Sequence, residues 1–287
     1  MITPERTQYA LEDGVMAAWR WPNRDKPILV FAHANGFNGG VYRQMLQSLS
    51  DRFEIIAPDL RGHGRTTLPA APDTHENWHV YARDLLALYG QLDRSPTLLG
   101  GHSMGASSTL LAAARMASPP ALALVEPVVL PPLMYLMAQS PLWPLIKARL
   151  PMGRQARARS NRWADREAVL ERYGSKTTFA NWAEGVLEHY LEDGLTVTAD
   201  GVRLSCDPFW EAANFEAQSH GLLPAVKTLG NKVHVLRAET GSTTINAAGM
   251  TARGAQITPI EGGHLIAMEN PQAVSDWIHF VADLEGI

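Results

Sequence analysis

Gly100-Gly101-His102-Ser103-Met104-Gly105 lies between an apolar run, Pro96–Leu99, and a run rich in Ala and Leu, Ala106–Met116. The first run is typical of a buried strand and the second of a helix. A serine flanked by glycines between a strand and a helix is typical of a nucleophile elbow, a tight turn that lifts the hydroxyl above a sheet edge. Ser103 is therefore a candidate nucleophile. The N–H group of Met104, at the start of the helix, has no intrahelical acceptor and is a candidate oxyanion donor.

Length and composition exclude several classes of protein. With 287 residues and 46% hydrophobic residues, the chain can form one large α/β domain with an insertion. The net charge of −4 gives no general attraction to nucleic acid, and the single cysteine, Cys206, favours a reducing compartment. Met1–Trp21 lacks the apolar run of a signal peptide, and no window approaches the roughly 20 apolar residues of a membrane span. We expect a cytoplasmic protein without nucleic-acid or membrane partners, whose oligomeric state the sequence does not indicate.

Short apolar runs alternate with helical patterns in the first and last parts of the chain. This alternation predicts an α/β fold, with a mostly parallel twisted sheet and helices on both faces. The expected strands are Gln8–Leu11, Val15–Trp19, Pro27–Ala32, Phe53–Ala57, Thr97–Gly100, Leu122–Glu126, Lys232–Arg237 and Gln256–Ile260. The expected helices between them are 41–49, 78–89, 106–116, 243–250 and 271–284.

The alternation stops after Pro127, where proline-rich and helical stretches follow. We predict a core domain over 1–127 and 223–287, with a mainly helical cap inserted at 128–222. The cap holds four tryptophans, which either line an apolar pocket over Ser103 or form the core of the cap itself: Trp143, Trp163, Trp182 and Trp210. Its basic run, Lys147–Arg166, is expected to be a solvated face rather than a nucleic-acid or anion site.

Four motifs in order make the chain resemble the α/β-hydrolase fold family, and the resemblance covers nearly all residues. It implies Ser103 as the nucleophile and His264 as the base, because a serine hydroxyl is a poor nucleophile unless an imidazole takes its proton. His33, His63 and His102 are expected to be structural members of their loops. The motifs are His33-Ala34-Asn35-Gly36, Asp59-Leu60-Arg61-Gly62-His63-Gly64, Gly101-His102-Ser103-Met104-Gly105, and Gly263-His264 with Glu269-Asn270-Pro271.

The carboxylate that would orient His264 has two candidates. After the seventh strand, where members of the family often carry an acid, this chain has Gly241 or Ser242. Glu126 stands at an alternative family position, directly after the sixth strand, and Glu239 is the other candidate. We favour Glu126, because a carboxylate at a buried strand end is costly unless it is paired.

The resemblance also implies a second oxyanion donor, the backbone N–H of Asn35, beside that of Met104. The side chain of Asn35 is an alternative donor, or the residue simply suits a turn. The chain departs from the family here, because Ala34 stands where glycine is usual.

Together these residues predict a serine hydrolase, most simply a carboxylesterase for small to medium apolar esters. We expect no metal and no organic cofactor, since the sequence has neither zinc-ligand spacing nor a phosphate-binding loop. The alternatives are a cofactor-free perhydrolase, a hydrolase of carbon–carbon bonds that uses the same serine, and a catalytically weak ligand-binding member of the fold.

Overall fold

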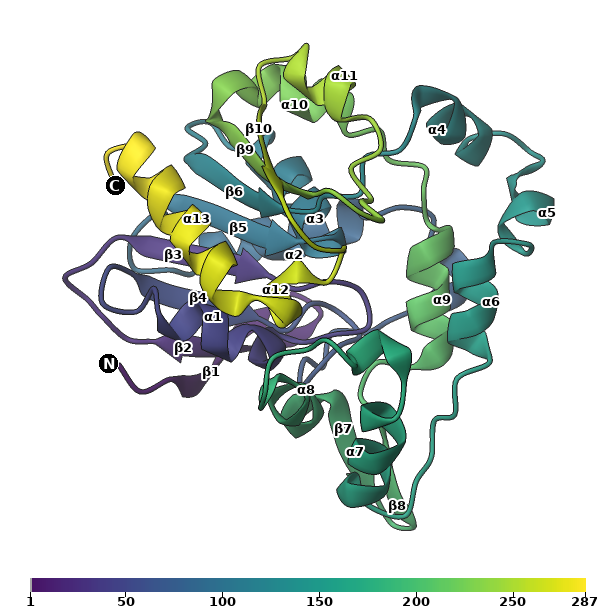
Figure 1. The fold of residues 1–287 in the computed structure, drawn as a ribbon. Coiled ribbons are helices and arrows are strands. Elements are labelled where there is room, and N and C mark those ends of the chain that lie inside the picture. The colour runs from purple at the N-terminus through teal and green to yellow at the C-terminus, as the bar shows by residue number, and fades with distance from the viewer. Residues whose placement is uncertain (1) are drawn as a thin grey trace.

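The computed structural model describes residues 2–287, which contain one eight-stranded sheet (Figure 1). Its strands are β1 Glu5–Leu11, β2 Gly14–Trp21, β3 Ile28–Ala32, β4 Glu54–Pro58, β5 Leu98–His102, β6 Ala121–Val125, β9 Val233–Ala238 and β10 Gln256–Ile260. They follow the order β1-β2-β4-β3-β5-β6-β9-β10. The pairs β1–β2 and β2–β4 are antiparallel and all others are parallel, so the predicted α/β fold with a mostly parallel sheet is confirmed.

Helices cover both faces of this sheet (Figure 1). One face carries α2 His79–Tyr89, α3 Met104–Ala113, α10 Leu223–Leu229 and α11 Ala247–Thr251. The other carries η1 Gly39–Tyr42, α1 Arg43–Gln47, α12 Ile266–Glu269 and α13 Pro271–Leu284. Because successive side chains of a strand point to opposite faces, the central strands must be apolar throughout. In β3, Ile28 and Val30 pack on the first face, whereas Leu29 and Phe31 pack on the second.

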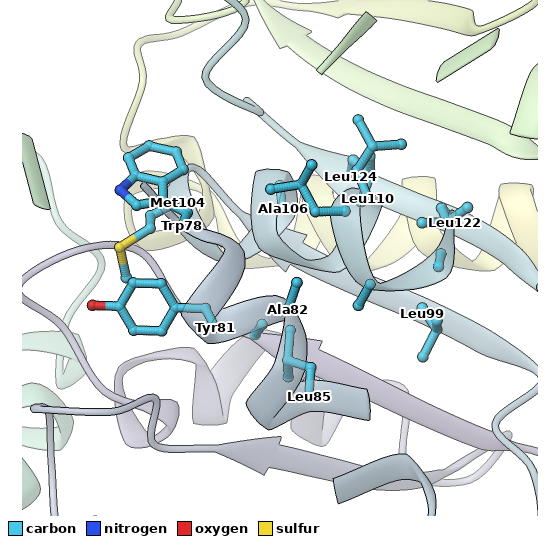
Figure 2. Close-up of a cluster of buried hydrophobic side chains, with 14 of the residues drawn as sticks. Trp78, Tyr81, Ala82, Leu85, Leu99, Met104, Ala106, Leu110, Leu122 and Leu124 are labelled. Carbon is cyan, nitrogen blue, oxygen red and sulfur yellow. The ribbon is translucent and has the colours of Figure 1, made fainter. Parts of the chain in front are cut away.

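The elbow helix α3 is fixed by a buried cluster between the sheet and α2 (Figure 2). Trp78 and Tyr81 lie beside Met104, and Leu110 packs over β5 and β6. Each fully buried leucine or aromatic side chain of this kind stabilises the fold by about 1.5–3 kcal/mol. Met104, the residue directly after Ser103, is therefore packed in the core, and this packing fixes the position of the turn.

Between β6 and α10 the chain forms six α-helices, a short 3-10 helix, η3 Thr177–Phe179, and one hairpin. The helices are α4 Pro132–Ala138, α5 Trp143–Lys147, α6 Pro151–Arg157, α7 Arg166–Gly174, α8 Val186–Gly194 and α9 Pro208–Glu216. The hairpin, β7 Leu195–Thr198 and β8 Gly201–Leu204, was not predicted, although its alternating apolar residues surround an Asp200-Gly201 turn signal. The division into a core and a cap, with its boundaries at 128 and 222, stays a prediction. No helix within residues 2–287 combines the length and apolar character needed to cross a membrane.

Candidate active site

The predicted site residues all follow carboxyl ends of parallel strands, which meet at one edge of the sheet. Asn35 follows β3, Ser103 follows β5, Glu126 follows β6 and His264 follows β10. The site is therefore assembled from four loops that lie far apart in the sequence.

The elbow has the strained backbone that its sequence predicts. Ser103 has φ 55° and ψ −116°, and its N–H donates to the carbonyl of Val125 at 2.9 Å. A Cβ at Gly105 would lie 2.3 Å from the carbonyl oxygen of Ala32, so only glycine fits there. Among residues 2–287, Ser103 and Glu126 are the only non-glycine residues with positive φ. Strain of this kind costs about 1–3 kcal/mol per residue and gathers at functional sites.

Ser103, His264 and Glu126 form a continuous hydrogen-bonded chain. The Nε2 atom of His264 lies 3.0 Å from the Oγ of Ser103, and its Nδ1 lies 3.0 Å from the Oε2 of Glu126. A carboxylate only accepts, so Nδ1 carries the proton and Nε2 is free to accept from the serine. The His264 side chain is 26% exposed, which leaves the imidazole accessible to water.

The carboxylate of Glu126 is fully buried and saturated with donors. Oε1 accepts from Ala238 N–H at 2.8 Å and from the Ser242 hydroxyl at 2.6 Å, and Oε2 accepts from Thr243 N–H at 2.9 Å. Burial acts to raise the pKa of Glu126, but the hydrogen bonds from His264 and these donors outweigh burial, and the pKa falls below its ordinary value. The group is therefore held as an anion beside His264.

The two candidate acids have different surroundings. Glu239 is exposed, whereas the Glu126 carboxylate is buried and lies 3.0 Å from His264 Nδ1. Ser242, which stands where the family resemblance implies an acid, donates to Glu126 instead. The hydroxyl of Thr243 lies 3.3 Å from His264 Nδ1 and donates to the Glu126 carbonyl at 3.0 Å. From the sequence we did not predict that the hydroxyls of Ser242 and Thr243 donate to Glu126.

Two backbone N–H groups near Ser103 are available to an external acceptor. Among residues 2–287, neither Asn35 N–H nor Met104 N–H has a hydrogen-bond acceptor. The side-chain amide of Asn35 is engaged elsewhere, because Nδ2 donates to the Glu211 carbonyl at 2.9 Å and Oδ1 accepts from Asn214 Nδ2 at 3.0 Å. Both partners belong to α9. The Asn35 side chain thus ties the loop after β3 to α9 rather than serving as a free donor.

The buried polar residues around Asn214 extend this connection. Asn214 Oδ1 accepts from the Tyr81 hydroxyl at 2.7 Å, and the Asn214 carbonyl accepts from Trp78 Nε1 at 3.1 Å. Asn214 and Tyr81 are both completely buried. The loop that carries Asn35 is therefore held from α2 through α9, a link that no local sequence pattern indicates.

A second set of buried hydrogen bonds, through Tyr42 and His102, connects the loop after β3 to His264. The Tyr42 hydroxyl accepts from Ala34 N–H at 3.1 Å and lies 2.8 Å from His102 Nδ1, while His102 Nε2 lies 2.8 Å from the His264 carbonyl. The carbonyl can only accept, so Nε2 of His102 carries its proton and Nδ1 accepts from Tyr42. Burial lowers the pKa of His102 to about 3, which keeps this tautomer neutral. The expectation of a structural His102 agrees with these contacts, and Tyr42 was not foreseen.

His33 and His63 hold the loops around the site. His33 accepts from Leu60 N–H at 2.8 Å, and His63 accepts from Gly36 N–H at 3.0 Å. Burial lowers the pKa of His63 to about 4, so it stays a neutral acceptor. Within residues 2–287, no group of three or more His, Cys, Asp or Glu side chains is arranged to hold a metal ion.

Comparisons with known proteins agree with this architecture. The model of the "Alpha/beta hydrolase family" matches residues 29–277. A 2-(acetamidomethylene)succinate hydrolase from Mesorhizobium japonicum is 39% identical over 89 residues, 31% of each chain. A bifunctional esterase/perhydrolase from Acinetobacter calcoaceticus is 33% identical over 132 residues, 45% of this chain and 47% of the relative. The matches thus span a third to a half of these relatives.

Solved structures extend the likeness to the whole fold. The crystal structure of E-2-(acetamidomethylene)succinate hydrolase superposes with a TM-score of 0.79 at 22% identity, covering 98% of this chain and all of that one. The enol-lactonase from Burkholderia xenovorans superposes with a TM-score of 0.65 at 18% identity, covering 96% of this chain and all of that one. The chain belongs to the alpha/beta hydrolase family.

Proposed function

We propose that the chain is a serine hydrolase that cleaves carboxylic esters through an acyl-enzyme on Ser103. The observation that carries the proposal is the chain of contacts from Glu126 to His264 to Ser103, with both joining distances at 3.0 Å. An imidazole in this tautomer can take the serine proton, and the buried carboxylate stabilises the imidazolium that results.

In the first half of the reaction, the Ser103 oxygen attacks the acyl carbon as its proton moves to His264 Nε2. The carbonyl oxygen becomes an oxyanion, which the free N–H groups of Asn35 and Met104 stabilise. By analogy with other hydrolases, each such donor contributes about 100- to 1000-fold to the rate. The tetrahedral intermediate then expels the alcohol, which takes the proton from His264, and an ester of Ser103 remains.

In the second half, His264 removes a proton from a water molecule, which attacks the acyl-enzyme. The second tetrahedral intermediate releases the acid, and Ser103 recovers its proton from His264. The partial exposure of His264 favours this step, because water can reach the imidazole.

A series of chromogenic esters from acetyl to decanoyl, assayed with wild type and Ser103→Ala, tests the proposal. We expect turnover that is highest at one chain length and is lost in the variant. If the folded wild type hydrolyses none of the esters, the ester assignment is wrong. In that case, failure of a fluorophosphonate to label Ser103 would favour the ligand-binding alternative.

Perhydrolysis is a second candidate, which the likeness to a bifunctional esterase/perhydrolase favours. Hydrogen peroxide would replace water in the attack on the same acyl-enzyme, giving a peracid and free Ser103. Measuring peracid formed from acetate and hydrogen peroxide tests it, since the product must vanish in Ser103→Ala. Hydrolysis of a carbon–carbon bond by the same serine remains the other predicted alternative.

A further inference from the structure

Charge is distributed unevenly along the chain between β6 and α7. Residues 127–164 contain six basic side chains and no acidic one, although the whole chain has a net charge of −4. The same segment holds six of the eleven large hydrophobic side chains that are exposed among residues 2–287. Those six residues are Leu133, Leu136, Met137, Leu142, Leu145 and Met152.

The exposed side chains belong to helices that are anchored by their opposite sides. In α4, Tyr135 is buried and its hydroxyl accepts from Leu130 N–H at 3.2 Å, while Leu133 and Leu136 are 65% and 66% exposed. In α5, Trp143 is buried and its Nε1 donates to the Glu216 carbonyl at 3.0 Å. Leu142 and Leu145, beside it, are each 62% exposed. These four exposed leucines lie on or beside two helices that follow each other in the chain, and we name them together the α4–α5 face.

Cations without carboxylate partners lie next to this face. Within residues 2–287, Lys147, Arg149 and Arg154 form no ion pair, whereas Arg157 is paired with Glu216. Lys147 and Arg154 line a groove of about 750 Å³ together with Phe209, which is 59% exposed. Asp73 and the paired Glu216 also line this groove. Figure 1 shows α4, α5 and α6 together at the outer end of the molecule, away from the sheet.

We propose that the α4–α5 face docks on the surface of a lipid bilayer that contains anionic lipids. Short helices with exposed leucines on one side and cations beside them insert shallowly among acyl chains, while the cations bind anionic headgroups. A second copy of the chain fits this face poorly. A two-fold interface sets the same patch against itself, and here it would set unpaired cations against cations.

This proposal goes beyond the ester hydrolase proposed above and does not depend on it. From the sequence we expected no membrane partner; the present proposal differs from that expectation and rests on the exposed α4–α5 face. On the buried side of α4, the ring centroid of Tyr135 lies 6.2 Å from that of His220, which lies 4.4 Å from that of Trp78. Trp78 lies beside Met104 (Figure 2). Buried rings thus link α4 to the residue that follows Ser103.

Vesicle flotation with the full chain tests the proposal. The vesicles are phosphatidylcholine alone, and phosphatidylcholine with about one third phosphatidylglycerol. We expect binding to the anionic vesicles that weakens with added salt. Each cation near the surface contributes about fivefold to binding, so Lys147→Gln/Arg149→Gln/Arg154→Gln should weaken it roughly 100-fold. Leu133→Ser/Leu136→Ser should weaken it more than tenfold, because two apolar side chains no longer leave water.

Matched variants on other faces separate docking from a general effect of charge or hydrophobicity. Arg24→Gln/Lys26→Gln/Arg253→Gln removes the same charge, and Phe280→Ser/Leu284→Ser removes two other exposed apolar side chains. Both should bind like wild type. The proposal is wrong if wild type does not float with the anionic vesicles, or if the two triple variants lose binding equally. It is also wrong if Leu133→Ser/Leu136→Ser abolishes only a dimer seen by sedimentation, because the face would then bind a second copy. Ser103→Ala should float unchanged, so loss of hydrolysis leaves this test intact.

Discussion

Replacing the Glu126 carboxylate by an amide of the same size should abolish most of the activity while the protein still folds. In Glu126→Gln the new NH2 group occupies the position of either Oε1 or Oε2. At Oε2 it faces Thr243 N–H and His264 Nδ1, which lie 2.9 Å and 3.0 Å from the native oxygen. At Oε1 it faces Ala238 N–H, 2.8 Å from the native oxygen. In both orientations a donor meets a donor.

The magnitude follows from these contacts. With the amide nitrogen at Oε2, His264 must accept on Nδ1, so Nε2 carries the proton and cannot take one from Ser103. With the nitrogen at Oε1, the tautomer survives but the charge that stabilises the imidazolium is lost. By analogy with other triads, kcat should fall about 10⁴-fold. One buried donor is left without an acceptor, which should lower the free energy of unfolding by about 1–3 kcal/mol.

Glu239→Gln is the matched control, because it removes one negative charge from an exposed side chain. Its stability should change by no more than about 0.5 kcal/mol, and its kcat should equal that of wild type. The assay is kcat on the preferred chromogenic ester, with urea unfolding measured in parallel. If Glu126→Gln keeps wild-type kcat, or if Glu239→Gln loses activity, the assignment of the acid is wrong.

Three further predictions concern the residues that support the site. Tyr42→Phe removes the hydroxyl that joins Ala34 to His102, so kcat should fall about tenfold at unchanged KM. The free energy of unfolding should fall by about 1–3 kcal/mol. A kcat equal to that of wild type would show that this hydrogen-bonded connection does not support the site. Asn214→Ala frees the Asn35 amide, so kcat/KM for the preferred ester should fall about tenfold, and wild-type kcat/KM would contradict the link through α9. The free energy of unfolding, measured with urea, should fall as the pH is lowered from about 7 to about 5. The slope should be up to about 1.4 kcal/mol per pH unit for each proton taken up on unfolding. Equal stability at the two pH values would refute this prediction. The reason is that five buried histidines have lowered pKa values, so in this pH range they take up protons on unfolding: His33, His63, His75, His102 and His220. Asp59, whose pKa burial raises to about 7, releases its proton on unfolding and so reduces the loss of stability.

The sequence was sufficient for features that depend on local patterns. The Gly-x-Ser-x-Gly turn requires glycine at positions where a Cβ would meet backbone, so Gly105 and its neighbours could be read directly. Glu126 became a candidate because the family resemblance allows an acid directly after the sixth strand, where a buried carboxylate needs partners. The parallel sheet followed from apolar runs separated by helical patterns.

Features that depend on contacts between distant segments could not be predicted. Tyr42 and His102 are 60 residues apart, and Asn35 and Asn214 are 179 apart, so no local pattern indicates either pair. The helix expected at 243–250 begins only at Ala247, because Thr243 is held by Glu126 through its N–H and hydroxyl groups. The outward leucines of α4 have the spacing of an ordinary core helix, and only the fold reveals which side is buried.

In the proposed mechanism, Ser103 is a nucleophile that His264 activates. Mass spectrometry of the whole chain after treatment with a fluorophosphonate, followed by peptide mapping, tests it most directly. We expect one adduct per chain, located on Ser103, and no adduct in a folded Ser103→Ala variant. A folded wild-type protein that gains no adduct, or gains it on another residue, would contradict the claim.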